Sequence, residues 1–347
     1  MAHFNIPIFI PHMGCPNQCV FCNQRSISGC TSFQREDVAP QIERALATLP
    51  HGSDVEIAFF GGSFTGIDRA LMIDLLECAE GYVKRGDVSS IRLSTRPDYI
   101  SKEILEILSR YSVRVIELGL QSMNDRVLIS SQRGHTAQDA RNACRMVREA
   151  GFTLVGQMMI GLPESSLEDE LETAREIVRM GASYARIYPT VVFYNTPLCD
   201  MAKAGGYQPL SLDGAVSRSA AVLRVFCEHG VPCIRIGLCA GEDFSSHDKV
   251  FAGPNHAALG EMVWAELYYE KLTGALSQRN LLGHDVVLHL PMSEVSKYVG
   301  QHRANIERLL RETDTRVHKI VGEKNLDEPM PCLWHRATPY EEVSPCI

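Results

Sequence analysis

The chain alternates between short apolar, β-branched runs and longer segments with helical periodicity. Six runs are nearly continuous in hydrophobicity, as strands buried on both faces of a parallel sheet are. They cover residues 6–10, 55–60, 91–95, 113–120, 153–160 and 185–193, and a possible seventh strand covers 233–238. This pattern predicts a central sheet whose strands are separated by helices.

The segments between these runs have recognisable helix ends. Thr136 and Ser166 stand where N-caps are expected, and Gly151 and Gly181 stand where a glycine ends a helix. Six strand–helix units in succession predict a right-handed parallel α/β architecture. Eight units would complete a barrel, so an open sheet and an incomplete barrel both fit. In either arrangement the chemistry belongs at the carboxyl ends of the strands.

The pattern changes near Gly241, where a loop leads into a long helix over about residues 255–272. A strand over 285–290, a helical stretch from Ser293 and a strand over 315–321 follow. We therefore predict an α/β domain over residues 1–240 and a small α+β domain over 241–323. The proline-containing tail, residues 324–347, is expected to be weakly structured.

The composition is that of an ordinary globular protein. Of 347 residues, 45% are hydrophobic and 22% are charged, which argues against disorder, collagen and coiled coil. The longest apolar runs fall short of a membrane span, and the N-terminal run lacks the features of a signal peptide. We expect a cytoplasmic protein without a membrane partner. The net charge of −8 means that nucleic acid binding would need a local basic patch.

Twelve cysteines in a chain without export signals suggest metal ligands or catalytic groups rather than disulfides. Cys15, Cys19 and Cys22 follow directly on the first predicted strand in a C-x3-C-x2-C pattern. Structural zinc usually takes four ligands, whereas three thiolates suit an iron–sulfur cube with one open iron. The alternatives are a zinc site completed by His12 and three cysteines that are merely packed.

This loop, with the aromatic Phe21 before its last cysteine, resembles the hallmark of the radical S-adenosylmethionine superfamily. The resemblance implies a partial (β/α)6 barrel in which Cys15, Cys19 and Cys22 hold a 4Fe–4S cluster. S-adenosylmethionine would chelate the fourth iron. Its reductive cleavage would yield a 5′-deoxyadenosyl radical that abstracts hydrogen from the substrate. An oxygen-sensitive enzyme and a one-electron reductant such as flavodoxin or ferredoxin are further implications.

Further landmarks of the superfamily stand at or near the ends of the later strands. The resemblance places glycines near the methionine amine, Gln121 near the ribose and Arg133 near the methionine carboxylate, which a guanidinium suits. The cofactor-binding residues predicted in this way are Phe21, Gly61, Gly62, Ser63, Ser94, Arg96, Gln121, Arg133 and Gly161. Glu117 and Arg186 are the predicted catalytic residues. Arg186 is either an inward charge near substrate or cofactor, or a side chain packed against a helix.

The order of these motifs over about residues 5–200 resembles the radical domain of the catalytic subunit of Elongator. That family modifies wobble uridine in tRNA and adds an acetyltransferase domain, of which no similar segment follows residue 240 here. The resemblance implies a short bacterial relative that acts on RNA, with tRNA favoured. The alternatives are a small-molecule or tetrapyrrole substrate, as in oxygen-independent coproporphyrinogen oxidase, and a non-catalytic iron–sulfur RNA-binding protein.

The strand–helix–turn–helix–strand pattern over residues 285–321 resembles a KH core, where a GxxG turn clamps an RNA backbone. Here the turn reads Gly300-Gln301-His302-Arg303 and lacks the second glycine, leaving Arg303 to contact phosphate. RNA binding and a plain accessory lobe are equally compatible with this segment. Three other cysteines could suggest an auxiliary cluster but also suit small buried hydrophobes. They are Cys227, Cys233 and Cys239.

Overall fold

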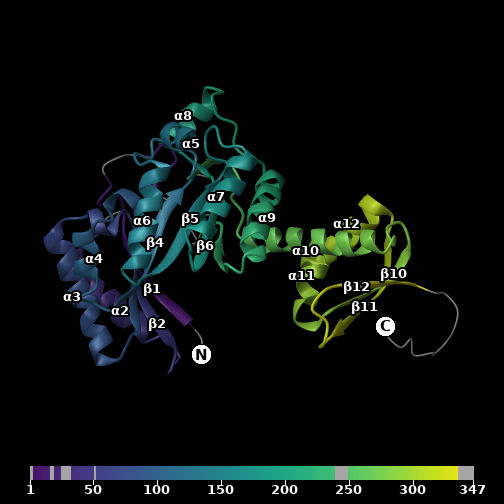
Figure 1. Ribbon diagram of the computed structural model, residues 1–347, viewed down its shortest axis with the longest axis horizontal. Helices are drawn as coiled ribbons and strands as arrows, with labels where there is room; N and C mark the ends of the chain where they lie inside the picture. Colours follow the sequence, from purple (N-terminus) through teal and green to yellow (C-terminus); the bar gives the residue numbers. More distant parts are fainter. Residues whose placement is uncertain (1–2, 16–18, 25–32, 51, 239–248, 335–347) are drawn as a thin grey trace. The chain divides into compact units, whose positions relative to one another are not determined.

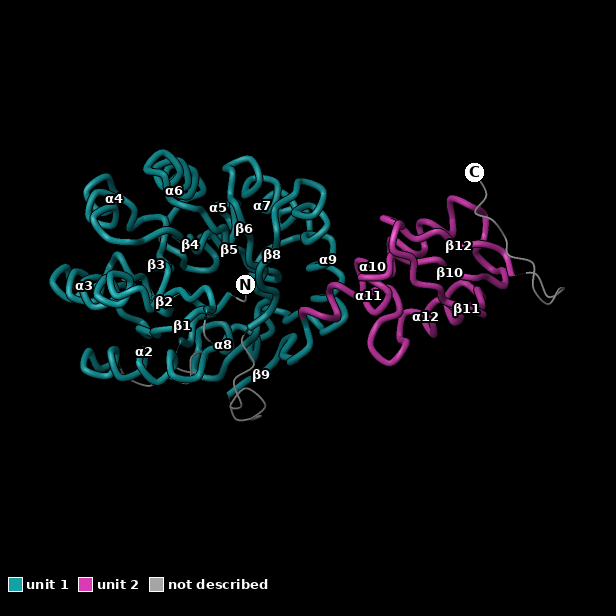
Figure 2. Tube along the Cα trace, turned by 90° about the horizontal axis from the view of Figure 1, so that it is seen from below, with its two compact units in different colours: residues 1–259 teal, residues 260–347 magenta. Residues whose placement is uncertain are grey.

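The computed structural model describes residues 3–15, 19–24, 33–50, 52–238 and 249–334. Its chain forms two compact units, residues 1–259 and residues 260–347 (Figures 1 and 2). The division between the units lies 19 residues after the boundary at 240 that the sequence pattern suggested. The reason is that β9 (Val250–Ala252) pairs with β7 (Val192–Phe193) and so belongs to the first unit.

Seven parallel strands form the main sheet of the first unit. Their order along the sheet follows the chain, β1-β2-β3-β4-β5-β6-β8, and the sheet curls into a half-barrel. The bounds are β1 (His3–Ile10), β2 (Asp54–Gly61), β3 (Ser90–Thr95), β4 (Val113–Gln121), β5 (Thr153–Ile160), β6 (Tyr184–Pro189) and β8 (Cys233–Ile236). The predicted partial barrel is thus confirmed. Its two edge strands are β1 and β8.

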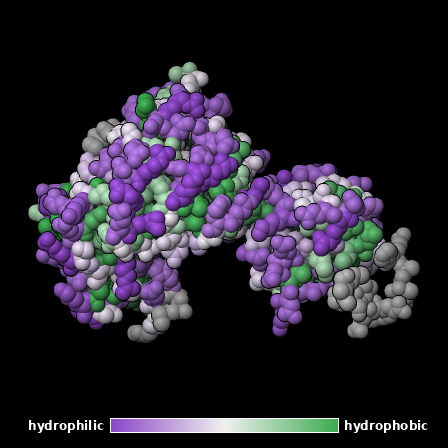
Figure 3. All heavy atoms as spheres, viewed as in Figure 1, coloured by the Kyte–Doolittle hydropathy of each residue, from purple (hydrophilic) through white to green (hydrophobic). Residues whose placement is uncertain are grey.

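Helices cover the convex face of this sheet, as Figure 2 shows. They are α2 (Val38–Leu46), α3 (Arg69–Arg85), α4 (Lys102–Leu108), α6 (Ala137–Glu149), α7 (Leu167–Arg179) and α9 (Leu212–Glu228), with short 3-10 turns over 35–37, 64–66 and 97–99. The short helices α5 (Asp125–Ser130) and α8 (Pro197–Lys203) lie at the carboxyl ends of the strands (Figure 1). Thr136 and Ser166 form capping boxes with Asp139 and Asp169, which confirms both predicted helix starts. The outer surface in Figure 3 is mainly hydrophilic, with apolar side chains scattered over it.

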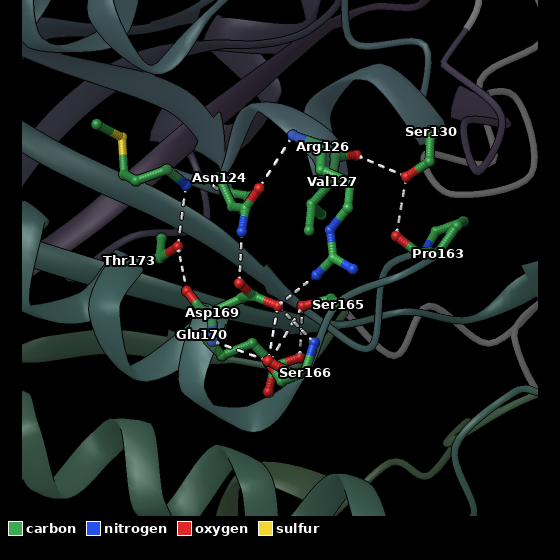
Figure 4. Close-up of polar contacts among 12 residues, drawn as sticks. Asn124, Arg126, Val127, Ser130, Pro163, Ser165, Ser166, Asp169, Glu170 and Thr173 are labelled. Atoms are coloured by element: carbon green, nitrogen blue, oxygen red, sulfur yellow. Dashed lines mark hydrogen bonds and ion pairs between the residues drawn. The ribbon is translucent and has the colours of Figure 1, made fainter.

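Side-chain bonds between the start of α7 and the loop before α5 join two strand ends (Figure 4). The Asn124 amide donates to Asp169, and Arg126 forms an ion pair with the same carboxylate at 3.3 Å. The Ser130 hydroxyl donates to the Pro163 carbonyl at 2.9 Å. These bonds connect the segments that follow β4 and β5. They hold in place the chain between Gln121 and Arg133, two predicted cofactor-binding residues.

The second unit is a small α+β unit with its own core. Its elements are α10 (Leu259–Gln278), which starts at the last residue of the first unit, β10 (Asp285–Pro291), α11 (Val295–Val299), α12 (Ala304–Thr313), β11 (Arg316–Glu323) and β12 (Met330–Leu333), with 3-10 turns over 292–294 and 301–303. Leu272, Leu276, Leu288 and Leu309 are fully buried in it. The predicted strand–helix–turn–helix–strand order is present.

The sheet of the second unit has the order β11-β10-β12, with β10 and β11 parallel and β12 antiparallel to β10. β12 comes from the tail that was expected to be weakly structured. Its backbone pairs with β10 over residues 330–333, which offsets the poor strand propensity of Pro329 before the strand and Pro331 within it. In the turn before α12, His302 and Arg303 both have positive φ, at 49° and 65°. Arg303 therefore takes a backbone conformation that a second glycine would adopt more easily.

Candidate active site

A cavity of about 1880 Å³ lies on the inner face of the half-barrel. It exceeds the roughly 300–1,000 Å³ of an ordinary small-molecule site, so it has room for more than one ligand. Twelve of the residues selected from the sequence line it. They are Cys15, Cys19, Phe21, Cys22, Gly61, Gly62, Ser94, Arg96, Glu117, Gln121, Arg133 and Arg186. The curled sheet brings together side chains that are up to 171 positions apart.

The loop carrying the three cysteines is held through the residue after Cys19. The Val20 N–H donates to the Ser131 carbonyl at 3.2 Å, and the Val20 carbonyl accepts from the Leu198 N–H at 2.9 Å. The Val20 side chain is buried against Val192 and Leu198. Because both backbone groups and the side chain of Val20 are engaged, α5 and α8 fix the position of the loop.

The three thiols lie close enough to influence one another. Burial raises the pKa of Cys22 to about 12, and the neighbouring Cys19 and Cys15 add to the shift. Burial also raises the pKa of Cys15. The Arg133 Nη1 donates to Cys19 Sγ at 3.4 Å. A group that binds here as a thiolate complex must therefore displace protons and supply positive charge of its own.

No three His, Cys, Asp or Glu side chains in the described part of the chain converge on a position for a single metal ion. A 4Fe–4S cube does not require such convergence, because each cysteine binds a different iron. His12 accepts a hydrogen bond from the Gln24 N–H through Nε2 at 3.1 Å, and it does not converge with two or more of the thiols on one point. The donor set therefore fits an iron–sulfur cluster better than the alternative zinc site.

Three of the predicted cofactor-binding residues that line the cavity each have a buried polar atom with no hydrogen-bond partner among the described residues. The atoms are Arg96 Nη1, Gln121 Oε1 and Arg133 Nε. Native proteins rarely leave buried polar atoms unpaired, so this grouping indicates a ligand. The guanidinium donors suit a carboxylate and the amide oxygen suits a hydroxyl or amine. The methionine and ribose groups of S-adenosylmethionine carry that combination.

The two arginines beside the cysteine loop are fixed by further bonds. Arg96 binds Asp98 through two contacts of 2.9 Å and donates to the Arg133 carbonyl at 2.6 Å. Arg133 donates through Nη2 to the Gly119 carbonyl at 2.6 Å. Their remaining donors are thus oriented before any ligand binds, which reduces the entropy lost on binding.

At the end of β2, the backbone around Gly62 passes very close to the backbone of the segment that leads into the cysteine loop. A side chain at Gly62 would place its Cβ 1.9 Å from the Met13 carbonyl oxygen, and one at Gly14 would lie 2.2 Å from the Ser63 carbonyl oxygen. The Gly62 N–H donates to Ile10 and the Ser63 N–H donates to Met13. The segment leading into the cysteine loop is therefore packed directly on this glycine pair.

Gly62→Ala is expected to destabilise the fold by about 1–3 kcal/mol, because backbone must move to admit the methyl group. Urea unfolding of the metal-free protein measures the change. Gly81→Ala is the matched control, since Gly81 lies exposed in α3 with no atom within 4 Å of its added Cβ. It should stabilise the protein slightly. Equal stabilities for Gly62→Ala and the parent would show that the crossing is looser than described.

Two of the predicted cofactor-binding residues have other partners. The Ser63 hydroxyl is fully buried and bonds Thr95 at 2.7 Å and the Arg96 N–H at 3.2 Å, behind the cavity wall. The Gly161 N–H donates to Glu170 at 2.6 Å and its carbonyl accepts from Tyr207 at 2.6 Å. Ser63 thus shapes the loops around the site, and both hydrogen-bonding groups of Gly161 are used within the protein.

A row of alternating charges crosses the inner face of the sheet below the cysteine loop. Arg92 contacts Glu56 at 2.8 Å and Glu117 at 2.9 Å. Arg186 contacts both oxygens of Glu117 at 2.9 Å and donates to the Tyr188 hydroxyl at 3.2 Å. Arg186 therefore lines the cavity rather than packing against a helix. Glu117 is the shared carboxylate between two arginines.

Sequence reasoning missed Glu56, Arg92 and Arg235 as cavity residues. The sequence feature that could have identified cavity residues is a charged residue inside an otherwise apolar strand, as at Glu56 in β2 and Arg92 in β3. His135 is a further residue without an assigned role. Burial lowers its pKa to about 4, and the charges of Arg133 and Arg96 add to the shift. It is therefore a neutral imidazole beside the site at physiological pH.

A half-barrel with three cysteines at the end of its first strand is the arrangement of radical S-adenosylmethionine enzymes. Family models agree, since the radical SAM superfamily matches residues 9–177 and the radical SAM C-terminal domain matches residues 182–269. The two matches together cover most of the chain. The protein belongs to the radical SAM superfamily.

Several known proteins are similar to this chain. An uncharacterized protein of Methanocaldococcus jannaschii is 28% identical over 67% of this chain and 74% of its own length. Elongator complex protein 3 of Saccharomyces cerevisiae is 30% identical over 51% of this chain and 36% of its own length. A tRNA uridine(34) acetyltransferase of Methanocaldococcus infernus is 34% identical over 36% of this chain and 24% of its own length. The chain thus spans only about a third or less of the last two proteins.

The fold is also found in a solved structure of Elp3 from Methanocaldococcus infernus that lacks residues 1–46. The TM-score is 0.59 at 18% sequence identity, over 81% of this chain and 64% of that one. At this identity the match supports the fold alone. Among the helices in the described ranges, none combines the length and the hydropathy that crossing a bilayer requires.

Proposed function

We propose that this protein is a radical S-adenosylmethionine enzyme that modifies tRNA. The observation that carries the proposal is the grouping of three cysteine thiols with the unpartnered atoms of Arg96, Gln121 and Arg133 in one large cavity. Relatives named for Elongator and for a tRNA uridine(34) acetyltransferase support tRNA as the substrate. Because the chain spans only part of these relatives, acetyl transfer is outside the proposal.

In this proposal Cys15, Cys19 and Cys22 hold a 4Fe–4S cluster. When bound, the cluster and S-adenosylmethionine supply a 5′-deoxyadenosyl radical that removes a hydrogen atom from the substrate. Arg96 and Arg133 bind the carboxylate of the cofactor through their free donors, and the Gln121 amide oxygen accepts from an amine or hydroxyl. The protein's own contribution is to orient these groups and to exclude water.

Arg186 and Glu117 act on the substrate side of the cavity. The Glu117 carboxylate holds the Arg186 guanidinium through two contacts, so its remaining donor capacity is directed into the cavity. Arg92 and Ser94 bind the same carboxylate, at 2.9 and 3.4 Å, and keep it in place. Glu117 is thus a positioning residue, and Arg186 is the residue that contacts substrate.

The test is anaerobic reconstitution with iron and sulfide, followed by dithionite and S-adenosylmethionine with and without tRNA. We expect 5′-deoxyadenosine to form and its rate to rise with intact tRNA but not with nuclease-digested tRNA. Nucleoside mass spectrometry then identifies the modified base. Product that does not respond to tRNA would refute the tRNA substrate and indicate a small molecule. A protein with a full cluster and no product would be a binding protein.

A further inference from the structure

Two arginines stand side by side on the last two strands of the half-barrel. Arg186 on β6 and Arg235 on β8 are register partners, and both line the cavity. Neighbouring strands are only about 4.8 Å apart, so side chains at paired positions on one face are close. Like charges at such positions repel each other unless an anion lies between them.

Within the charged row, Arg92 and Arg186 both have carboxylate partners, whereas Arg235 has none among the described residues. Glu56 and Glu117 balance Arg92 and Arg186. Arg235 has no carboxylate partner among the described residues, and its Nε donates to the Gly237 carbonyl at 3.3 Å. Its two terminal nitrogens remain as donors. A half-buried positive charge beside Arg186 therefore has no counter-ion within the described chain.

A hydroxyl donor stands beside these arginines. Tyr188 follows Arg186 by two positions on β6, lines the same cavity and accepts a hydrogen bond from Arg186. Its own proton is therefore free to be donated. Burial raises the pKa of Tyr188, although the arginine charge opposes the shift, so the hydroxyl keeps its proton at neutral pH. Two guanidinium groups and one hydroxyl form a donor set for the oxygens of an anion.

The position of this donor set suits a ligand that enters from the side of the sheet. β8 is an edge strand of the half-barrel, and β1 at the other edge also lines the cavity through Asn5, Pro7 and Phe9. Arg235 thus stands at one rim of the concave face. Enzymes that act on a base take it out of the stack into a pocket, while its backbone stays nearer the rim.

We propose that Arg235, together with Tyr188 and Arg186, binds a backbone phosphate of the RNA substrate and so positions the target nucleotide in the cavity. This inference rests on the proposed tRNA substrate. A phosphate is the expected anion because a planar guanidinium pairs with it bidentately. Each nucleotide of an RNA substrate that enters the cavity also brings a backbone phosphate with it. Arg235 is then a substrate-binding residue of the first unit, independent of the KH-like unit.

The test compares Arg235→Gln and Arg235→Lys with the parent in tRNA-dependent formation of 5′-deoxyadenosine. We expect Arg235→Gln to raise the KM for tRNA about tenfold or more, with kcat changed much less, since one charge-assisted phosphate contact is lost. Fluorescence anisotropy measures the binding of labelled tRNA to the metal-free protein at several salt concentrations. For Arg235→Gln, the slope of the logarithm of the binding constant against the logarithm of the salt concentration should be smaller in magnitude than that of the parent by about one unit. Arg235→Lys should recover part of the affinity.

Arg145→Gln is the matched control, because Arg145 lies exposed on α6 and its one ion pair within the described residues is with Glu149. It should leave the KM and the salt slope unchanged. Arg235→Gln should also unfold no more easily than the parent, because it removes repulsion without breaking an ion pair. An unchanged KM and salt slope in Arg235→Gln would overturn the inference while leaving the tRNA substrate intact. A parent enzyme indifferent to tRNA would overturn both.

Discussion

Replacing Cys19 by alanine is expected to reduce the reconstituted iron content from about four atoms per chain to a small residue, and to abolish cleavage of S-adenosylmethionine. Cys19 is the middle ligand of the proposed cluster and the thiol that Arg133 contacts. With two cysteines left, two irons of a cube would have no protein ligand. Iron and sulfide assays and the visible absorption of the cluster measure the effect directly.

The control for this experiment is Cys227→Ala. Cys227 is an exposed cysteine near the end of α9, and it is one of the residues considered for an auxiliary cluster. We expect this variant to keep the full iron content and full activity. A Cys19→Ala protein that assembles a complete cube would refute the ligand assignment. Partial loss of iron in Cys227→Ala would instead point to a second cluster.

Replacing Glu117 by glutamine is expected to destabilise the fold by about 3–5 kcal/mol. Glu117 is 1% exposed and is the shared carboxylate of Arg92 and Arg186. Without it, Arg186 remains largely buried, with the Tyr188 hydroxyl as its one remaining side-chain hydrogen-bond partner among the described residues. The cost is that of an unpaired buried charge, rather than the net contribution of the ion pair. Urea unfolding of the metal-free protein measures it.

Glu149→Gln is the matched change at the surface. Glu149 is 62% exposed and pairs with Arg145 at 3.4 Å, so its loss should change stability by less than about 0.5 kcal/mol. The double variant Glu117→Gln/Arg186→Gln should lose less than the sum of the single variants, because it removes the stranded charge together with its partner. Additive losses, or a Glu117→Gln protein as stable as the parent, would contradict the shared-carboxylate arrangement.

The local pattern of residues determined much of the fold. The predicted strands, the capping residues Thr136 and Ser166 and the order of elements in the second unit all depend on neighbours within a few positions. Such features are readable because buried parallel strands require continuous apolar runs and helix ends require specific caps. The cluster cysteines were found for the same reason, since all three lie within eight consecutive residues.

What the sequence could not show were features that depend on register between distant segments. Gly62 meets the Met13 carbonyl, and Gly161 is used by Glu170 and Tyr207, which only the packed chain reveals. The tail strand β12 likewise needs its partner β10, some 40 residues earlier. A four-residue segment has too little propensity to form a strand alone, so its pairing partner decides its structure.

The sequence by itself determined the class of fold, the cysteine motif and the set of residues that stand at strand ends. Their convergence followed from one rule, that the carboxyl ends of parallel strands meet at one edge. The row from Glu56 to Arg186 and the place of Arg235 beside it were decided by the tertiary structure alone. Those contacts depend on strand register and on the curl of the sheet, which align residues up to 69 positions apart in one ion pair. The local sequence pattern does not determine which residues of distant strands are aligned, because that alignment is set when the strands pair in the sheet.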